Sequence, residues 1–243
     1  QQSSNEGPAP SLNQLSRPIS EVVFTAAAVT RCQAIVRGWL VRRPKTGVLA
    51  KRRKEWNRKF KAVMREIVNT ETMYLNQLKV IVDDYRTPLR KDVADKKIAN
   101  VNTATLDDVF PSSIDDIKAL SEELLKTLNS QLETATSADD LRFGKVFVDF
   151  APRLSVYSHY VKDFSRSIKA WTKLLSNESW QASLAAIKKK SNSKWDLSMY
   201  LIVPVQRVPR YELLLKSLFN TTLQTNADYA TCKKAVEAVQ NVN

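Results

Sequence analysis

Glycine, histidine and cysteine are scarce in this chain of 243 residues, and each scarcity excludes a class of site. There are 4 glycines, and neither a GxxxxGK[ST] nor a GxGxxG string occurs, so we predict no phosphate-binding loop. The 2 cysteines, Cys32 and Cys232, and the single His159 do not have metal-ligand spacing, so we predict no metal site and no cofactor. Any nucleotide or Mg²⁺ connected with its function would belong to a partner protein.

Long apolar runs and alternating strand patterns are also missing. The longest apolar stretch near the N-terminus, residues 22–29, is too short to cross a bilayer, and no cleavable signal is evident. We therefore expect a cytoplasmic protein, with recruitment to a membrane or the cytoskeleton as a further expectation. Leu, Lys, Glu and Ala recur at helical spacing, which predicts an all-α helical bundle.

The net charge of +13 is concentrated in one segment. Residues 31–65 contain 13 Lys and Arg against a single acid, Glu55, whereas the rest of the chain has 25 basic and 24 acidic residues. This distribution points to an acidic protein or an anionic membrane surface as partner of that segment alone. We expect no nucleic-acid binding, because no aromatic-basic platform accompanies the charge.

Changes in pattern divide the chain into three parts. Residues 1–20 are polar and aperiodic, which predicts a flexible lead-in. Residues 21–47 read as one helix and a break at Pro44 and Gly47, and residues 48–243 as the main domain. Further helices are expected over residues 106–132, 141–175, 179–190, 197–223 and 227–243.

A long helix ending at Pro88 should carry an apolar stripe with one acid inside it. The stripe positions lie within about 60° of one line along the helix, and they are Phe60, Met64, Ile67, Val68, Leu75, Leu78 and Val82. Glu71 lies about 20° from the same line. A buried carboxylate is costly unless it meets donors. Glu71 therefore forms an internal salt bridge, lies in a stripe that is partly solvated, or faces an external protein.

A second unusual segment, residues 201–215, places two prolines and two arginines in an apolar helical pattern. Because Val208 precedes Pro209, we expect the helix to kink there. Gln206, Arg207 and Arg210 then offer amide and guanidinium donors beside an apolar surface. Either arginine could instead form an ordinary helix-to-helix ion pair.

Four segments of the chain, including the two described above, resemble the Dbl-homology (DH) domain, the exchange-factor module of Rho-family GTPases. LIVPVQRVPRYELLLKSLF (201–219) resembles that family's signature, and FKAVMREIVNTETMYLNQL (60–78) resembles its first block, ELxxTExxYxxxL. VFPSSIDDIKALSEELLKTL (109–128) and VFVDFAPRLSVYSHYVKDF (146–164) resemble the blocks between them, in the family's order. The resemblance covers about residues 56–243 and implies an elongated six-helix bundle.

The resemblance also implies which residues meet the GTPase. Glu71 occupies the position that engages switch I, and Arg210 the one that engages switch II. Ile202 occupies a position that discriminates between partners and leans toward a Rac-like GTPase. The family's last helix has an asparagine that contacts switch II; here the helix is truncated, and Asn243 is its candidate.

The N-terminal helix resembles an IQ motif, IQxxxRGxxxR, with Cys32 in the aliphatic first place. Such helices bind calmodulin or calmodulin-like light chains. Apolar anchors alternate with cations that suit an acidic partner, and the implied binding residues are Gln33, Ile35, Val36, Arg37, Gly38, Trp39, Leu40, Arg42 and Arg43. A membrane-facing basic helix and a helix packed on the bundle are the alternatives.

The resemblances together predict a guanine nucleotide exchange factor for a Rho-family GTPase, without covalent chemistry, regulated through the IQ helix. Mg²⁺ and the guanine nucleotide would be ligands of the GTPase. The alternative is a non-catalytic scaffold that binds the GTPase or calmodulin passively.

Overall fold

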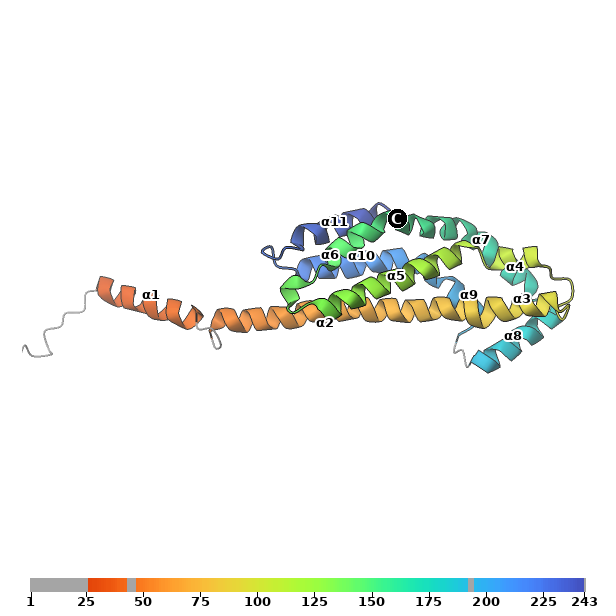
Figure 1. Ribbon diagram of the computed structural model, residues 1–243, viewed down its shortest axis with the longest axis horizontal. Helices are drawn as coiled ribbons and strands as arrows, with labels where there is room; N and C mark the ends of the chain where they lie inside the picture. Colours follow the sequence, from red (N-terminus) through yellow and green to blue (C-terminus); the bar gives the residue numbers. More distant parts are fainter. Residues whose placement is uncertain (1–25, 43–46, 192–194, 243) are drawn as a thin grey trace, which may run out of the picture. The chain divides into compact units, whose positions relative to one another are not determined.

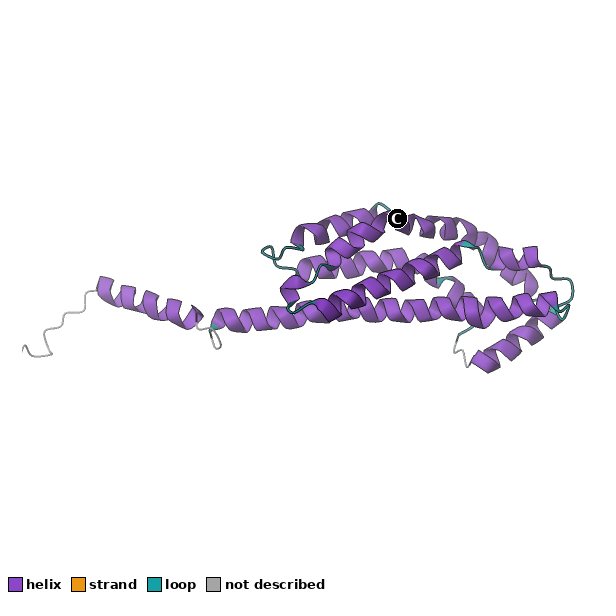
Figure 2. Cartoon of the chain, viewed as in Figure 1, coloured by secondary structure: helices purple, strands orange, loops and turns teal. Residues whose placement is uncertain are grey.

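The computed structural model describes residues 26–42, 47–191 and 195–242. Every regular element in these ranges is a helix (Figures 1 and 2), which confirms the all-α prediction. Contacts divide the chain into two compact units at Glu55 and Trp56, inside helix α2. The lead-in predicted for residues 1–20 lies outside the described residues.

The first unit contains α1 (Ala26–Arg42) and the start of α2 (Val48–Lys79). The second contains the rest of α2 and all later elements, which are η3 (Val80–Arg86), α3 (Thr87–Ala94), α4 (Thr103–Val109), α5 (Ser113–Thr134), η4 (Ala138–Asp140), α6 (Phe143–Phe150), η5 (Ala151–Ser155), α7 (Val156–Leu174), α8 (Glu178–Ser191), α9 (Leu197–Leu201), α10 (Val203–Thr221) and α11 (Tyr229–Gln240).

The predicted apolar stripe of α2 forms one side of the core of the second unit. All seven stripe residues are buried, and three of them, Phe60, Met64 and Leu78, are completely inaccessible. In this unit α2 lies beside α5 and α10 (Figure 1), and Trp56 anchors it by donating its indole N–H to the Thr221 carbonyl at 2.6 Å. The periodicity alone therefore identified the packed face.

The prediction that the long helix ends at Pro88 was wrong. The chain passes from α2 through a π-helical segment, η3, into α3, with Pro88 in the first turn of α3. Within that wider turn the Thr87 N–H bonds to the Val82 carbonyl, five residues back. Proline needs no backbone donor in a first turn, so the helical path continues to Ala94.

Val208 and Pro209, where we expect a kink, do not interrupt the helix. Helix α10 runs through Pro209, and the interruption lies at Ile202, between α9 and α10. Pro209 is exposed, whereas Val208, the residue before it, is buried. Tyr211, about one turn after Val208, is buried as well. Their packing offsets the lost backbone hydrogen bond. At the true break, the buried Tyr160 hydroxyl donates to the Leu201 carbonyl at 2.8 Å.

Two other predicted helices are each divided into shorter helices near a proline, and the sequence pattern did not predict these divisions. Residues 106–132 contain the end of α4 and most of α5, with Pro111 between them. Residues 141–175 contain α6, the short 3-10 helix η5 with Pro152, and α7. Proline restricts the backbone of the residue before it and removes a backbone hydrogen-bond donor, which accounts for both divisions.

Asp228 joins two elements distant in sequence. Its carboxylate accepts hydrogen bonds from the backbone N–H groups of Gly144, at 2.6 Å, and Lys145, at 3.1 Å, in the first turn of α6. Asp228 is fully buried and precedes α11. It therefore caps α6 while fixing the start of α11, which packs on α6 and α10.

The described helices include none that is long and apolar enough to span a membrane. Among the same residues no group of His, Cys, Asp and Glu has an arrangement suited to a metal ion. Cys32 and Cys232 are both free thiols.

Candidate partner-binding groove

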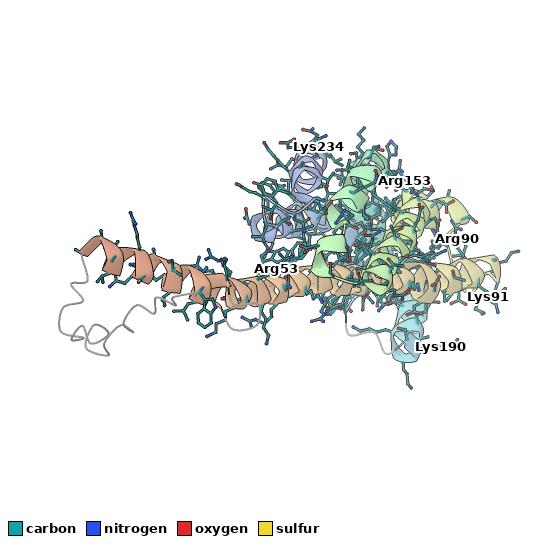
Figure 3. The ribbon with its side chains drawn as sticks, turned by 60° about the vertical axis from the view of Figure 1, so that its left-hand side comes forward. Arg53, Arg90, Lys91, Arg153, Lys190 and Lys234 are labelled. Atoms are coloured by element: carbon teal, nitrogen blue, oxygen red, sulfur yellow. The ribbon has the colours of Figure 1, made fainter. Side chains whose placement is uncertain are left out.

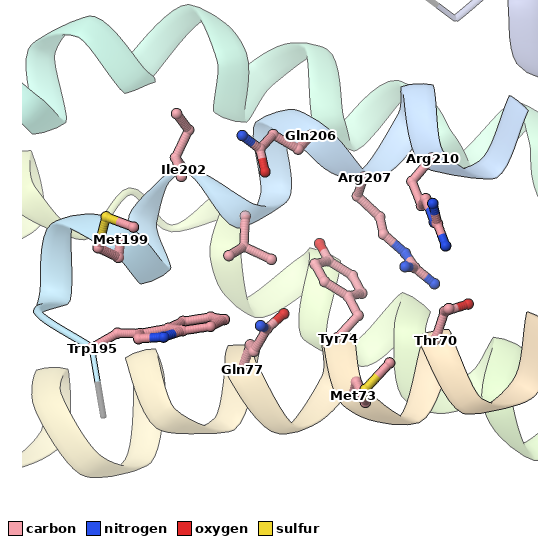
Figure 4. Close-up of a pocket in the computed structure, with 11 residues that line it drawn as sticks. Thr70, Met73, Tyr74, Gln77, Trp195, Met199, Ile202, Gln206, Arg207 and Arg210 are labelled. Carbon is pink, nitrogen blue, oxygen red and sulfur yellow. The ribbon is translucent and has the colours of Figure 1, made fainter. Parts of the chain in front are cut away.

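A groove of about 540 Å³ lies between α2 on one side and α9 with the start of α10 on the other (Figure 4). Its rim exposes four apolar side chains, with 59% of Met73, 56% of Met199, 45% of Trp195 and 36% of Ile202 accessible. Exposed apolar side chains gathered around a concavity are typical of protein interaction surfaces. Thr70, Gln77, Gln206 and Arg210 add polar groups to the lining.

Gln206, Arg210 and Ile202, which the sequence identified from the segment around Pro209, all line this groove. Gln206 and Arg210 are exposed, and the α-helical spacing of Ile202, Gln206 and Arg210 places them on one side of α10 and its preceding turn. Figure 4 shows these three side chains along the upper wall. The structure thus brings the predicted α10 residues to a single accessible surface.

Arg210 faces an acid that the sequence analysis did not select. Its guanidinium lies 3.3 Å from a carboxylate oxygen of Glu66 on α2, and both side chains are about half exposed, at 48% and 52%. Helical geometry could have predicted that exposure, because Glu66 is two residues from Met64 and therefore about 200° from the buried face. Nothing in the sequence showed which residue it would meet.

Glu71 does not face this surface. It is completely buried, and its carboxylate accepts hydrogen bonds from the Ser121 hydroxyl on α5, the Arg207 guanidinium and the Tyr211 hydroxyl, the last at 2.8 Å. The internal salt bridge, one of the three interpretations of this acid, is therefore the observed one. A partly solvated stripe and direct contact with an external protein are both incompatible with this arrangement, because Glu71 has no accessible surface.

Arg207 completes the buried cluster. Its guanidinium lies over the rings of Tyr74, 4.6 Å from the centroid, and Tyr211, 4.4 Å away. Burial lowers the pKa of Arg207, but Tyr211 and Glu71 more than reverse this and hold it above its ordinary value. Burial also raises the pKa of Tyr211 and Tyr74 well above their ordinary value. The cluster is therefore the Arg207–Glu71 ion pair enclosed by phenols that resist ionisation.

The buried cluster and the exposed groove share a wall. Glu71 and Glu66 lie on α2, and Arg207 and Arg210 lie on α10, so each helix contributes one charge to the interior and one to the surface. Arg207 and Tyr74 also line the groove from beneath. The interior pair consequently fixes the spacing of the two helices that present the exposed residues.

Helix α1, which carries the IQ-like sequence, buries none of its residues. Its apolar anchors are widely exposed, with 68% of Ile35 and 54% each of Val36 and Trp39 accessible. The Arg37 guanidinium donates to the backbone carbonyl and side-chain amide oxygen of Gln33, at 3.3 and 3.4 Å. The predicted Arg43 and, at the other end of the chain, Asn243 lie outside the described residues.

Comparison with known proteins gives consistent matches. The family model for the RhoGEF domain matches residues 63–243. The Rac guanine nucleotide exchange factor JJ of Dictyostelium discoideum is 29% identical over 222 residues, covering 88% of this chain and 18% of that protein. The human phosphatidylinositol 3,4,5-trisphosphate-dependent Rac exchanger 2 protein is 27% identical over 74% of this chain and 11% of its own length.

Solved structures share the fold. A crystal structure of the DH domain of FARP2 superimposes with a TM-score of 0.62 at 25% identity, covering 74% of this chain and 84% of that one. A structure of the Vav1 exchange factor gives a TM-score of 0.67 at 23% identity, with 77% of this chain and 48% of that chain covered. The chain spans less than a fifth of the length of the two curated relatives named above.

Proposed function

Because the chain belongs to the RhoGEF domain family, we propose that it stimulates GDP release from a Rho-family GTPase. A Rac-like GTPase is the first candidate, supported by Ile202 at the groove and by two relatives whose names describe Rac exchange. We further propose that residues 48–243 form a six-helix DH-type domain.

The observation that carries this proposal is the groove between α2 and α10. It combines exposed apolar side chains with the Glu66–Arg210 pair, and a buried ion pair holds its two walls together. Arg210 and Gln206 would donate to carboxylates and backbone carbonyls of the GTPase, and Glu66 would accept from its backbone N–H groups. Glu71 would act from the interior, as a positioning residue for both walls.

Exchange then follows from differential binding. A protein that binds the nucleotide-free GTPase more tightly than the loaded form must, by linkage, weaken nucleotide binding by the same factor. The groove residues would hold the GTPase switch segments away from the positions that bind Mg²⁺ and phosphate. Both of these are ligands of the GTPase, and no covalent step on this chain is required.

A fluorescent-GDP release assay over a panel of Rho-family GTPases tests the proposal. We expect release to accelerate with at least one member, a Rac-like GTPase first, and to be slowed by substitution of Arg210. The alternative, a passive scaffold, would bind a GTPase without changing its release rate. Unchanged release across the whole panel would exclude exchange activity.

We also propose that α1 binds calmodulin or a calmodulin-like light chain. The supporting observation is its set of exposed apolar anchors, Ile35, Val36, Trp39 and Leu40, alternating with cations on a helix with no buried residue. Such a helix suits a groove-forming acidic partner.

Titration of the chain with calmodulin, with and without Ca²⁺, tests this second proposal. Trp39→Ala should weaken binding at least tenfold, because aromatic anchors dominate such interfaces. Regulation is supported if calmodulin changes GDP release by the full chain and leaves a chain without residues 1–47 unaffected.

A further inference from the structure

Helix α2 carries a row of basic side chains on a face that the groove does not use. Arg58, Lys61 and Arg65 recur at steps of three and four residues, so they lie on one side of the helix. All three are exposed. In the sequence, Lys51 and Lys54 continue the same spacing toward the N-terminus.

Among the described residues, these three cations have no counter-charges. Within the part of the chain that the structure describes, no carboxylate lies within ion-pair distance of Arg58, Lys61 or Arg65. Elsewhere in the same unit cations commonly have such partners, as Arg90 has Asp107. The acid next to Arg65, Glu66, lies about 100° further around the helix and faces Arg210 instead. The row therefore concentrates uncompensated positive charge.

The surroundings of the row favour a flat anionic surface over a nucleic acid. The aromatic residues of this stretch point elsewhere, since Phe60 is fully buried and Trp56 stacks on it with ring centroids 5.0 Å apart. Bases would thus find no exposed aromatic side chain to stack on. None of the three cations lines the groove. Flexible cations on an exposed helix face suit the headgroups of anionic lipids.

We propose that Arg58, Lys61 and Arg65 bind an anionic membrane surface. On α2 the row lies about 100° around the helix from Met73, which lines the groove, and from Glu66, which pairs with Arg210. Contact of the row with lipid therefore leaves the groove accessible to a protein partner. The association is peripheral and electrostatic, so it weakens as salt rises.

Vesicle sedimentation of the full chain tests this proposal, using phosphatidylcholine vesicles with and without about 30% phosphatidylserine. We expect binding only to the vesicles that contain phosphatidylserine. The triple variant Arg58→Gln, Lys61→Gln, Arg65→Gln should reduce the apparent affinity at least about tenfold, because each cation near an anionic surface contributes to attraction. High salt should release the wild-type chain.

A second triple variant, Lys91→Gln, Lys190→Gln, Lys234→Gln, is the matched control. It removes the same charge from exposed lysines on α3, α8 and α11 (Figure 3) and should retain vesicle binding. Equal losses in the two variants would attribute binding to net charge and overturn the proposal. So would a wild-type chain that stays unbound, or one that binds single-stranded RNA through this row and not the vesicles.

Urea unfolding verifies that both variants are folded, and it does not depend on exchange activity. GDP release measured without vesicles should be the same for the wild type and the Arg58, Lys61, Arg65 variant. Loss of vesicle binding with normal release would therefore assign the row to the membrane and leave the proposed exchange function untouched.

Discussion

Two glutamates on α2, five residues apart, illustrate how position decides the role of a side chain. Glu71 is fully enclosed and hydrogen-bonded to Ser121, Arg207 and Tyr211, whereas Glu66 is half exposed and pairs with Arg210. Removing one partner of a buried pair leaves an uncompensated charge, but an exposed pair is screened by water. The two acids should therefore respond differently to the same substitution.

Glu71→Gln should lower the free energy of unfolding by about 3 to 5 kcal/mol, because Arg207 would remain buried without its counter-charge. Glu66→Gln, the matched control, should change it by less than about 1 kcal/mol while slowing GDP release. Urea unfolding and GDP release of both variants check this pair of outcomes. A fully stable Glu71→Gln variant that had lost exchange would instead make Glu71 a direct contact.

Arg210→Ala should slow GDP release by about 10- to 100-fold, since charge-assisted contacts contribute roughly 1.5 to 3 kcal/mol. Its unfolding free energy should stay close to wild type, because the lost ion pair is exposed. Arg153→Ala is the control: Arg153 forms a similarly exposed pair with Glu123, and we expect unchanged release. Equal slowing by both substitutions would contradict a specific role for Arg210.

Single residues were predictable where helical periodicity governs them. It placed Glu71 inside the stripe, and the same geometry accounts for the exposure of Glu66. Which residues meet across α2 and α10 was not predictable. Arg207 and Arg210 are the same residue type three positions apart on α10, yet Arg207 is buried and Arg210 is exposed. The family pattern pointed to Glu71 for the partner surface, and burial assigns it to the interior.

At the scale of elements, α6 and α11 lie close together at Gly144. A Cβ atom there would lie 2.5 Å from the backbone nitrogen of Cys232 and 2.7 Å from its Cα. Backbone atoms inside a helix cannot move aside singly. The glycine is therefore required by the contact between these two helices.

Gly144→Ala should destabilise the second unit by about 1 to 3 kcal/mol, the usual cost of overpacking a core. Thermal or urea unfolding measures the change. Gly38→Ala on α1 provides the comparison, because its added methyl meets only the flexible end of Arg42. A Gly144→Ala variant as stable as Gly38→Ala would contradict the close approach.

Asp115 links α5 to η3 through Arg86, which donates two hydrogen bonds to its carboxylate, one at 2.7 Å. These bonds lower the pKa of Asp115 below its ordinary value. The stabilisation is therefore complete above the ordinary aspartate pKa, about 3.9, and is lost as pH falls through the lowered folded value. Asp115→Asn should reduce this acid-side loss of unfolding free energy, measured by urea titrations from neutral pH downward.

The boundaries of the helices were less predictable than their buried faces. The start of the long helix, the bounds of α8 and the start of α11 were located closely by pattern, but Pro111 and Pro152 divided two predicted helices. Pro209 lies inside α10 without interrupting it, whereas Ile202 separates α9 from α10. Proline limits the local backbone, and the packing of neighbours such as Tyr211 decides whether a helix accommodates it.

At the scale of the whole molecule, charge and packing are distributed unequally between the two units. The excess of basic residues lies within residues 31–65, and α1 contributes no buried residue. The buried aromatic and aliphatic residues belong to the unit that starts at Trp56. Folding stability should thus reside in that unit.

Deleting residues 1–47 should leave the unfolding midpoint and the basal GDP release unchanged, because the deleted part includes none of the described core. The same deletion should abolish calmodulin binding. Differential scanning calorimetry, GDP release and calmodulin titration of the two chains check these outcomes. A lower unfolding midpoint in the shortened chain would show that the first unit stabilises the second.

The π-helical segment η3 has a consequence for how the chain tolerates changes in length. Its turns take up more residues than α-helical turns, so the seven residues Val80–Arg86 set the angular phase between α2 and α3. Rewinding them as a regular α-helix would rotate the buried Leu89 and the Arg90 partner of Asp107 away from their contacts. Insertions and deletions here should be far less tolerated than substitutions at the exposed Asp83.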